Sequence, residues 1–319
     1  MLLVGPSDET LHAHAGLRRR ALERLGCRVA TFDSQRSGGW LSRLNRAGLQ
    51  DRLARAIAAA SPGVVVVVED SRLDPNLVDW LKRGSNATWA GWFCDSCRAP
   101  DRVQSLAAAC DLVLIADSGA AGTLTERGAP PVRYLAPGCD PSIHRPMRAR
   151  DRFRANVVFV GTATPHRERL LLELVEYGLA VWGPGWRKTR LRDYCRGELL
   201  AHEDYVRAYA GASVAINLLC GGEQDVMEGP GCNRRLFEVA AIGVPQVVED
   251  VPDLHRHFSE GSEILAFRTS GDLRTLTAEA LQDRAWAEQV AAGGRQRALS
   301  EHTYMHRMIE LLHLAWAGA

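Results

Sequence analysis

A run of five valines is the feature that most constrains the fold of this chain. Val64–Val68 is apolar at every position and contains no glycine or proline. Such a run is typical of a strand buried on both faces, which occurs mainly in parallel sheets covered by helices. Because parallel strands need long crossover connections, usually helical, the run predicts an α/β fold.

Strand-like and helix-like segments alternate through the first half of the chain. The predicted strands are 1–4, 28–32, 64–68, 89–93, 111–116 and 131–135. The predicted helices are 17–25, 40–60 and 77–82, where apolar residues recur at helical spacing. This alternation predicts a doubly wound, Rossmann-like unit.

Proline and glycine then concentrate between Ala136 and Pro146, which marks a linker. The pattern restarts with predicted strands at 156–161, 180–183, 214–218, 245–249 and 264–267. Two long helices, at about 271–299 and 302–316, are expected to close the chain. We therefore predict two α/β domains, 1–146 and 147–300. Ligands of such sheets bind beyond the carboxyl ends of the strands, so a groove between the two sheets is the expected site.

Size and composition agree with two folded domains. The chain has 319 residues, 46% of them hydrophobic, and its mean hydropathy is −0.16. No apolar run approaches the length that crosses a bilayer, so no integral membrane segment is expected. The first residues lack a secretory signal and the eight cysteines suit a reducing compartment, which predicts a cytoplasmic protein. A net charge of +1 gives no indication of nucleic-acid binding.

One segment, from Gly229 to Pro245, has the pattern of a glycine loop followed by a short helix. Asn233 is the predicted N-cap, and Gly243 is the predicted stop. Arg234 and Arg235 fall in the first turn, where the helix dipole is already positive, so a bound phosphate would relieve the repulsion. Glu238, one turn further, faces either that ligand or solvent. The alternative is an ordinary surface helix whose arginines point to water.

Several segments in order along the second half resemble one known family. They are Phe159–Gly161 followed by Arg167–Leu170, Val181–Trp186, Tyr205–Tyr209 with Ala215–Asn217, the residues Asn233, Arg235, Phe237 and Glu238, and Glu301–Arg307. Over about residues 110–316 the chain resembles the CgeB-like (spore maturation protein) glycosyltransferases of the GT-B superfamily. The first hundred residues resemble that superfamily only in fold.

The resemblance implies two facing Rossmann-like domains: an acceptor-binding domain at 1–146 and a nucleotide-sugar-binding domain at 147–300. It also implies that residues 301–319 form a helix that crosses back to brace the first domain. A nucleoside diphosphate sugar would be the co-substrate, with a small molecule or glycan as acceptor. No metal or other cofactor would be needed, because helix dipoles and basic side chains hold the diphosphate.

The same resemblance assigns roles to individual residues. Glu238 would bind the ribose hydroxyls, Gly161 would let the backbone approach the diphosphate, and Asn233 and Arg235 would bind the phosphates. The predicted donor-binding residues are Gly161, Arg167, Arg169, Trp182, Gly183, Asn217, Gly231, Asn233, Arg235 and Glu238. A second glutamate, found in many retaining relatives eight positions earlier, is replaced by Pro230, so the stereochemical outcome stays open.

Candidates for the catalytic base come from the first half. Asp95 follows a predicted strand at its carboxyl end, and His12 and His14 lie in the first strand–helix loop. Arg235 is the predicted stabiliser of the leaving diphosphate. The alternative for each of the three base candidates is a residue that caps or solvates a loop. Trp182 could stack on a base or sugar, or belong to the core. Cys94 and Cys97 have redox-motif spacing but lack a second pair.

We therefore predict a metal-independent glycosyltransferase that moves a sugar from a nucleoside diphosphate sugar to an acceptor hydroxyl or amine. One alternative is an epimerase or hydrolase of nucleotide sugars on the same fold. Another is a catalytically silent nucleotide-sugar-binding protein. A dinucleotide-dependent dehydrogenase is disfavoured, because neither candidate loop has Gly-x-Gly-x-x-Gly spacing.

Overall fold

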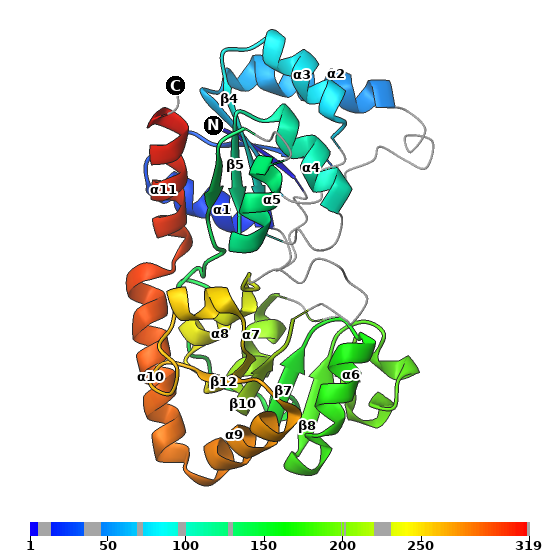
Figure 1. The fold of residues 1–319 in the computed structure, drawn as a ribbon, viewed down its shortest axis with the longest axis vertical. Coiled ribbons are helices and arrows are strands. Elements are labelled where there is room, and N and C mark those ends of the chain that lie inside the picture. Colours follow the sequence, from blue (N-terminus) through cyan, green and yellow to red (C-terminus); the bar gives the residue numbers. More distant parts are fainter. Residues whose placement is uncertain are drawn as a thin grey trace. The chain divides into compact units, whose positions relative to one another are not determined.

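The computed structural model describes residues 1–5, 14–34, 46–68, 73–94, 100–126, 130–198, 200, 202–219 and 231–317. The chain divides into two compact units (Figure 1). Unit 1 comprises Met1–Ala136 and Tyr304–Ala319, and unit 2 comprises Pro137–Thr303. Unit 2 thus begins at Pro137 and includes residues 137–146, which were predicted from the sequence to end the first domain. Within unit 2, the backbone N–H of Cys139 bonds to the carbonyl of His302.

Unit 1 is built on a sheet of six parallel strands in the order β2-β1-β3-β4-β5-β6. The strands are β1 (Leu2–Gly5), β2 (Ala30–Asp33), β3 (Val64–Val68), β4 (Thr88–Phe93), β5 (Leu112–Ile115) and β6 (Val132–Tyr134). The helices are α1 (His14–Arg24), α2 (Arg46–Ala60), α3 (Pro75–Arg83), α4 (Pro100–Ala109), α5 (Ser118–Glu126) and α11 (Tyr304–Ala317). The valine strand pairs with β1 and β4, and all five of its residues are buried, as its composition predicts.

Unit 2 is a second sheet of six parallel strands, ordered β12-β11-β10-β7-β8-β9. The strands are β7 (Ala155–Val160), β8 (Leu179–Trp182), β9 (Cys195–Gly197), β10 (Ala212–Asn217), β11 (Gln246–Glu249) and β12 (Leu265–Phe267). The α-helices are α6 (Pro165–Leu172), α7 (His202–Ala210), α8 (Arg235–Ile242), α9 (Ser270–Gln282) and α10 (Arg284–Glu301). Short 3₁₀ helices cover Asp151–Phe153, Val175–Tyr177, Trp186–Lys188, Arg192–Tyr194 and Pro252–Arg256.

The strand order of unit 2 has a topological switch point between its neighbours β7 and β10. From β7 the chain runs to β8 and β9 on one side, whereas β10 is followed by β11 and β12 on the other. Loops that leave such a pair diverge, so the carboxyl ends of the two strands are where ligands of open α/β sheets bind.

The end of the chain differs from the prediction of two long helices. Three helices cover the region, because a break at Asp283 separates α9 from α10. The Asp283 carboxylate accepts a hydrogen bond from the backbone N–H of Trp286 and so caps α10. The predicted stretch from 271 to 299 therefore contained two helices with one cap between them.

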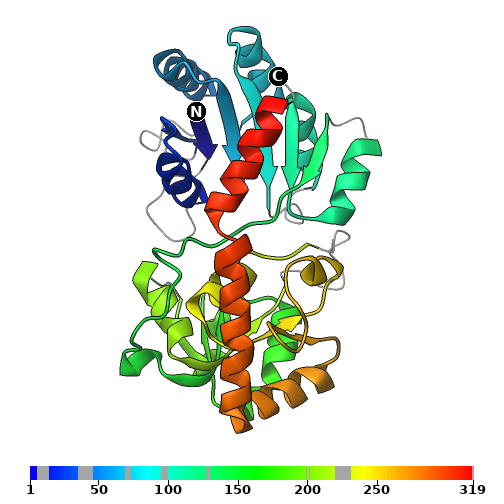
Figure 2. The same cartoon turned by 90° about the vertical axis from the view of Figure 1, so that its left-hand side faces the viewer.

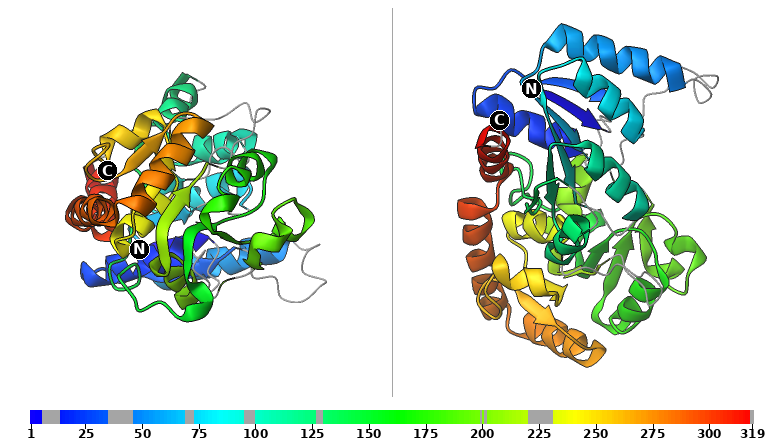
Figure 3. Two further views of the ribbon diagram at one scale, coloured as in Figure 1. Left: turned by 90° about the horizontal axis from the view of Figure 1, so that it is seen from below. Right: turned by 45° about the horizontal axis from the view of Figure 1, so that its top comes forward.

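The last helix, α11, belongs to unit 1, as the resemblance predicts. It lies beside α1 (Figures 2 and 3). The guanidinium of Arg18 on α1 is buried, lying 3.9 Å from the ring centre of Trp92 and 5.4 Å from that of Tyr304. Arg307 also donates through Nε to the carbonyl of Ala136. These contacts stack a cation between rings from β4 and α11 and hold the helix in place.

None of the described helices combines the length and the apolar character that crossing a bilayer requires.

Candidate active site in unit 2

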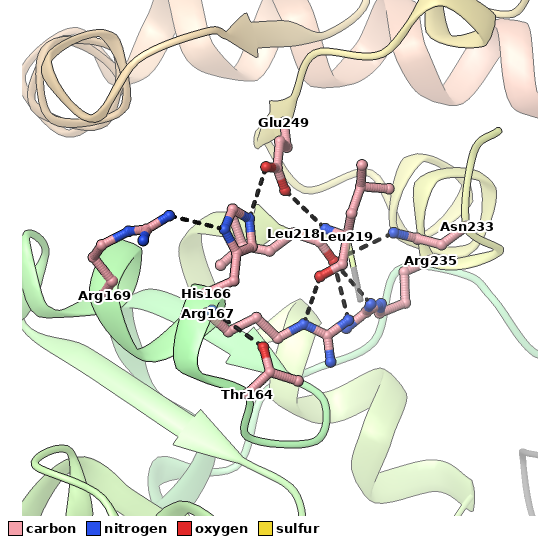
Figure 4. Close-up of polar contacts among 9 residues, drawn as sticks. All are labelled: Thr164, His166, Arg167, Arg169, Leu218, Leu219, Asn233, Arg235 and Glu249. Atoms are coloured by element: carbon pink, nitrogen blue, oxygen red, sulfur yellow. Dashed lines mark hydrogen bonds and ion pairs between the residues drawn. The ribbon is translucent and has the colours of Figure 1, made fainter. Parts of the chain in front are cut away.

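Two arginine side chains meet at the switch point of unit 2, beyond the carboxyl ends of β7 and β10 (Figure 4). Arg235 opens α8 and donates through Nη1 to the carbonyl of Val160 at 2.6 Å and through Nη2 to that of Leu218 at 3.1 Å. Val160 is the last residue of β7 and Leu218 directly follows β10. Arg235 therefore bridges the two strands that define the switch point.

Arg167, in the first turn of α6, approaches the same place. It is 1% exposed, and three of its nitrogens donate to the carbonyls of Thr162, Leu218 and Leu219 at 2.8–3.2 Å. Both guanidinium carbons also lie 5.4 Å from the ring centre of Phe159. Fixed carbonyls and an aromatic ring thus hold two positive groups at one sheet edge. The orientation of both groups is set without any ligand, which is what preorganised anion stabilisation needs.

Two glycines make this packing possible. A Cβ on Gly161 would lie 2.5 Å from Nη1 of Arg235, so only glycine leaves the guanidinium its position. Gly183 has φ of +131° and a Cβ there would lie 2.1 Å from the carbonyl oxygen of Gly161. Both predicted glycines therefore lie at the site, and their first effect is to let protein groups approach each other.

Asn233 is not the helix cap that the sequence predicts. Arg234 occupies the N-cap position of α8 and makes no side-chain cap bond. Instead, Asn233 donates through Nδ2 to Oδ1 of Asn217, the last residue of β10, at 2.8 Å. The prediction failed because a nearby strand end competes with the helix for this amide. At the other end of α8, Gly243 has φ of +82° and ends the helix as predicted.

The sequence leaves Glu238 facing either a ligand or solvent, and the structure excludes solvent because the side chain is buried. It is 1% exposed, and Tyr205 on α7 donates its hydroxyl proton to Oε2. Nε2 of His144 and Nε of Arg234 each lie 3.7 Å from Oε1. Burial, followed by the negative charge of Glu238, raises the pKa of Tyr205 well above its ordinary value, so the phenol stays a donor. The backbone N–H of Asp140 bonds to Nδ1 of His144, which leaves the ring proton on Nε2, facing the carboxylate.

A third polar group links α6 to the end of β11. Glu249 lies 2.8 Å from Nε2 of His166 and accepts a hydrogen bond from the backbone N–H of Leu219. Although burial opposes ionisation, these hydrogen bonds outweigh it and lower the pKa of Glu249. Arg169 lies 3.4 Å from the other ring nitrogen of His166. Glu249 therefore joins the loop after β10 to the first turn of α6 (Figure 4).

The two tryptophans that flank Gly183–Gly185, Trp182 and Trp186, are core residues. Trp182 is 2% exposed and its ring centre lies 6.1 Å from that of Phe153. Trp186 is fully buried, packs edge-on against Phe159 and donates to the carbonyl of Gly161. This favours the core alternative for Trp182. Gly231 precedes Asn233 by two residues in the sequence, and its predicted role in donor binding stays a prediction.

The candidate catalytic bases are only partly within the described residues. His12 and Asp95 lie outside them, as does Cys97. His14 is the first residue of α1, and its side chain is not described. Among the described residues, no group of three or more His, Cys, Asp and Glu side chains is arranged to hold a metal ion.

Sequence reasoning missed His144, His166, Tyr205 and Glu249 as site residues. Glu249 and His166 each carried a weak signal, since Glu249 ends a predicted strand and His166 follows one, both at the carboxyl edge of the sheet. His144 lies in the proline-rich linker, where composition indicates only a connection.

Comparison with known proteins agrees with this geometry. A family described as "Glycosyl transferase-like" matches residues 167–313, which include Arg167, Asn217, Arg235 and Glu238. Among solved structures, sucrose-phosphate synthase from Thermosynechococcus elongatus superposes with a TM-score of 0.69 at 14% identity, over 100% of this chain and 99% of that one. The chain is a glycosyltransferase with the GT-B fold.

Two further structures support the fold. HepE from Anabaena, solved in complex with UDP and glucose, has a TM-score of 0.66 at 12% identity over 99% of this chain and 100% of its own. The catalytic domain of starch synthase IV from Arabidopsis thaliana, bound to ADP and acarbose, has a TM-score of 0.69 at 9% identity over 99% and 98%. No curated protein matches the sequence.

Proposed function

We propose that this glycosyltransferase moves a sugar from a nucleoside diphosphate sugar to an acceptor hydroxyl or amine without a metal ion. The donor binds unit 2 and the acceptor binds unit 1. Within the superfamily, we assign the chain to the CgeB-like branch, on the segments from Phe159 to Arg307 that resemble it.

The observation that carries the proposal is the convergence of Arg167 and Arg235 at the switch point of unit 2. Breaking the bond between sugar and diphosphate places growing negative charge on the leaving group. Two guanidiniums fixed beforehand at the binding edge stabilise that charge without reorganising. In a metal-dependent enzyme a divalent cation supplies this charge, so the arginine pair favours a metal-independent reaction.

The other predicted residues take supporting parts in the proposal. Glu238 binds the ribose hydroxyls, with His144 and Tyr205 fixing its carboxylate. The acceptor proton is accepted by a base among Asp95, His12 and His14, since each follows a strand of unit 1 in the sequence. A cytoplasmic location also belongs to the proposal, because eight cysteines spread along the chain suit a reducing compartment.

The first test is calorimetric titration with nucleoside diphosphates of different bases, for the parent protein and for Arg235→Gln. We expect at least one diphosphate to bind, and the variant to bind it at least tenfold more weakly, because a charge-assisted contact contributes about 1.5–3 kcal/mol. Arg187→Gln is the matched control, since Arg187 lies in the same unit with a side chain 69% exposed. Absence of binding by any diphosphate would contradict the proposal.

The second test separates transfer from the alternatives. Donor sugars are incubated with and without acceptor mixtures, and products are identified by mass spectrometry. A glycosylated acceptor supports transfer. Free sugar or an epimerised donor without any acceptor product indicates a hydrolase or epimerase instead, and binding without any turnover indicates a silent binding protein.

A further inference from the structure

Two asparagine amides at the end of β10 contain hydrogen-bonding atoms that the described residues do not satisfy. Asn217 and Asn233, here called the amide pair, are joined by one hydrogen bond of 2.8 Å. The remaining atoms, Nδ2 of Asn217 and Oδ1 of Asn233, are both shielded from solvent and have no hydrogen-bond partner among the described residues. Asn217 as a whole is 2% exposed. Since buried polar groups are almost always bonded in folded proteins, these two atoms point to a bound group.

The chemistry of that group follows from the chemistry of the amides. Each primary amide has one carbonyl oxygen and one NH₂ group. A single hydrogen bond between two amides therefore leaves one NH₂ group and one carbonyl oxygen, and this stays true if both amides are turned over together. At neutral pH an ionised phosphate oxygen only accepts hydrogen bonds, and it would be repelled by the carbonyl oxygen that remains. A hydroxyl both donates and accepts, so it satisfies both atoms.

The position of the amide pair indicates which hydroxyl. Asn233 Nδ2 lies 3.5 Å from the carbonyl of Leu218, the same oxygen that accepts hydrogen bonds from Arg167 and Arg235. The pair is thus next to the guanidiniums assigned to the diphosphate. In a nucleotide sugar the diphosphate is flanked by the ribose and by the transferred sugar, whereas the base lies beyond the ribose. The carboxylate of Glu238, the ribose candidate, is contacted by Tyr205, His144 and Arg234.

We propose that Asn217 and Asn233 form a subsite that recognises a hydroxyl of the transferred sugar. This assignment replaces the phosphate role predicted for Asn233 and rests on the proposed function. It makes the amide pair a determinant of donor-sugar specificity, because a sugar without a hydroxyl at that position leaves buried polar atoms unpaired.

The test compares each nucleoside diphosphate with its own sugar ester by calorimetry, using UDP with UDP-glucose, ADP with ADP-glucose and GDP with GDP-mannose. We expect the parent protein to bind one sugar ester more tightly than the corresponding diphosphate. Asn217→Ala should weaken that ester about tenfold, as expected for one lost hydrogen bond to a buried group, and leave the diphosphate affinity unchanged within twofold. Asn156→Ala is the control, because Asn156 is an exposed asparagine of the same unit.

Asn217→Asp provides a second variant that keeps the shape and the acceptor for Asn233 but removes the NH₂ donor. It should reproduce the selective loss, and circular dichroism with thermal unfolding shows that both variants fold. Equal weakening of ester and diphosphate would assign the pair to the nucleotide, and no weakening of either would make it purely structural. Each result would overturn the inference. The inference would also be overturned if the parent protein bound a diphosphate but bound no sugar ester more tightly than that diphosphate. If the parent protein bound no diphosphate at all, the proposed function would be overturned as well.

Discussion

Replacing Gly161 by alanine gives the sharpest test of how the arginine site is built. The added Cβ would lie 2.5 Å from Nη1 of Arg235 and 3.0 Å from Cζ of Phe159. Real Cβ atoms do not approach other groups that closely, so the flexible guanidinium must move. It would then lose its hydrogen bonds to Val160 and Leu218.

The magnitude can be worked from those bonds. A hydrogen bond that involves a charged group contributes about 1.5–3 kcal/mol, and we expect at least one of the two to be lost. Gly161 does not have a positive φ, so alanine also restricts the unfolded chain and returns about 0.4–1 kcal/mol. The net expectation is a destabilisation of about 1–2 kcal/mol, together with at least a tenfold loss of nucleoside diphosphate affinity.

Urea unfolding measures the loss of stability and calorimetry measures the loss of affinity. Alanine variants of two other glycines serve as comparisons. Gly183→Ala should be much more damaging, because its Cβ would meet the backbone oxygen of Gly161 at 2.1 Å and its φ is +131°. Gly122→Ala should stabilise slightly, because Gly122 lies in helix α5 with nothing within 4 Å of an added Cβ. If Gly161→Ala behaved like Gly122→Ala and bound the nucleotide normally, the guanidinium position would not matter for function and the reasoning would be refuted.

Three further predictions concern other parts of the chain. Because the pKa of Glu249 is lowered in the fold, its ionised form stabilises the protein above the unfolded-state pKa of about 4.3, and this contribution is lost as the pH falls through the folded-state pKa. Glu249→Gln should therefore destabilise the protein at pH 7 but progressively less in acid. Urea unfolding at several pH values measures this, and a loss of stability that is independent of pH would contradict it. Burial raises the pKa of Cys110 to about 12, so its thiol should resist alkylation at pH 8 in the folded protein, as checked by mass spectrometry of native and denatured samples. Asp283→Ala removes the cap of α10 and should lower the free energy of unfolding by about 0.5–2 kcal/mol, with exposed Asp193→Ala as the control.

Most strands could be predicted because a buried strand consists almost entirely of apolar residues. Val64–Val68 is apolar throughout, and its observed bounds agree with the predicted ones. The three-residue edge strand β9 was missed, since Cys195–Gly197 includes an exposed arginine and has no apolar run. Local composition therefore identifies strands that carry an apolar run, inside a sheet or at its edge, and misses a strand without one.

The site was predicted less well, because its geometry depends on partners that are far apart in the sequence. Asn233 has the composition of a helix cap, yet its amide bonds to Asn217, sixteen residues earlier. Glu238 was expected to face either a bound ligand or solvent, and nothing in the sequence indicated that Tyr205 and His144 enclose it from other elements. No spacing rule within the helix reveals these partners.

The arginines show how the same motif leads to a different physical account. From the sequence, Arg234 and Arg235 were expected to be repelled by the helix dipole unless a bound anion relieved the repulsion. In the folded chain, Arg234 faces Glu238 and Arg235 donates to two strand-end carbonyls, so neither depends on a ligand for its position. The carbonyl oxygens orient the guanidinium of Arg235 without neutralising its positive charge. Arg235 is therefore a fixed positive charge at the switch point of the sheet, which is more useful to a departing diphosphate than a flexible side chain that must first be ordered.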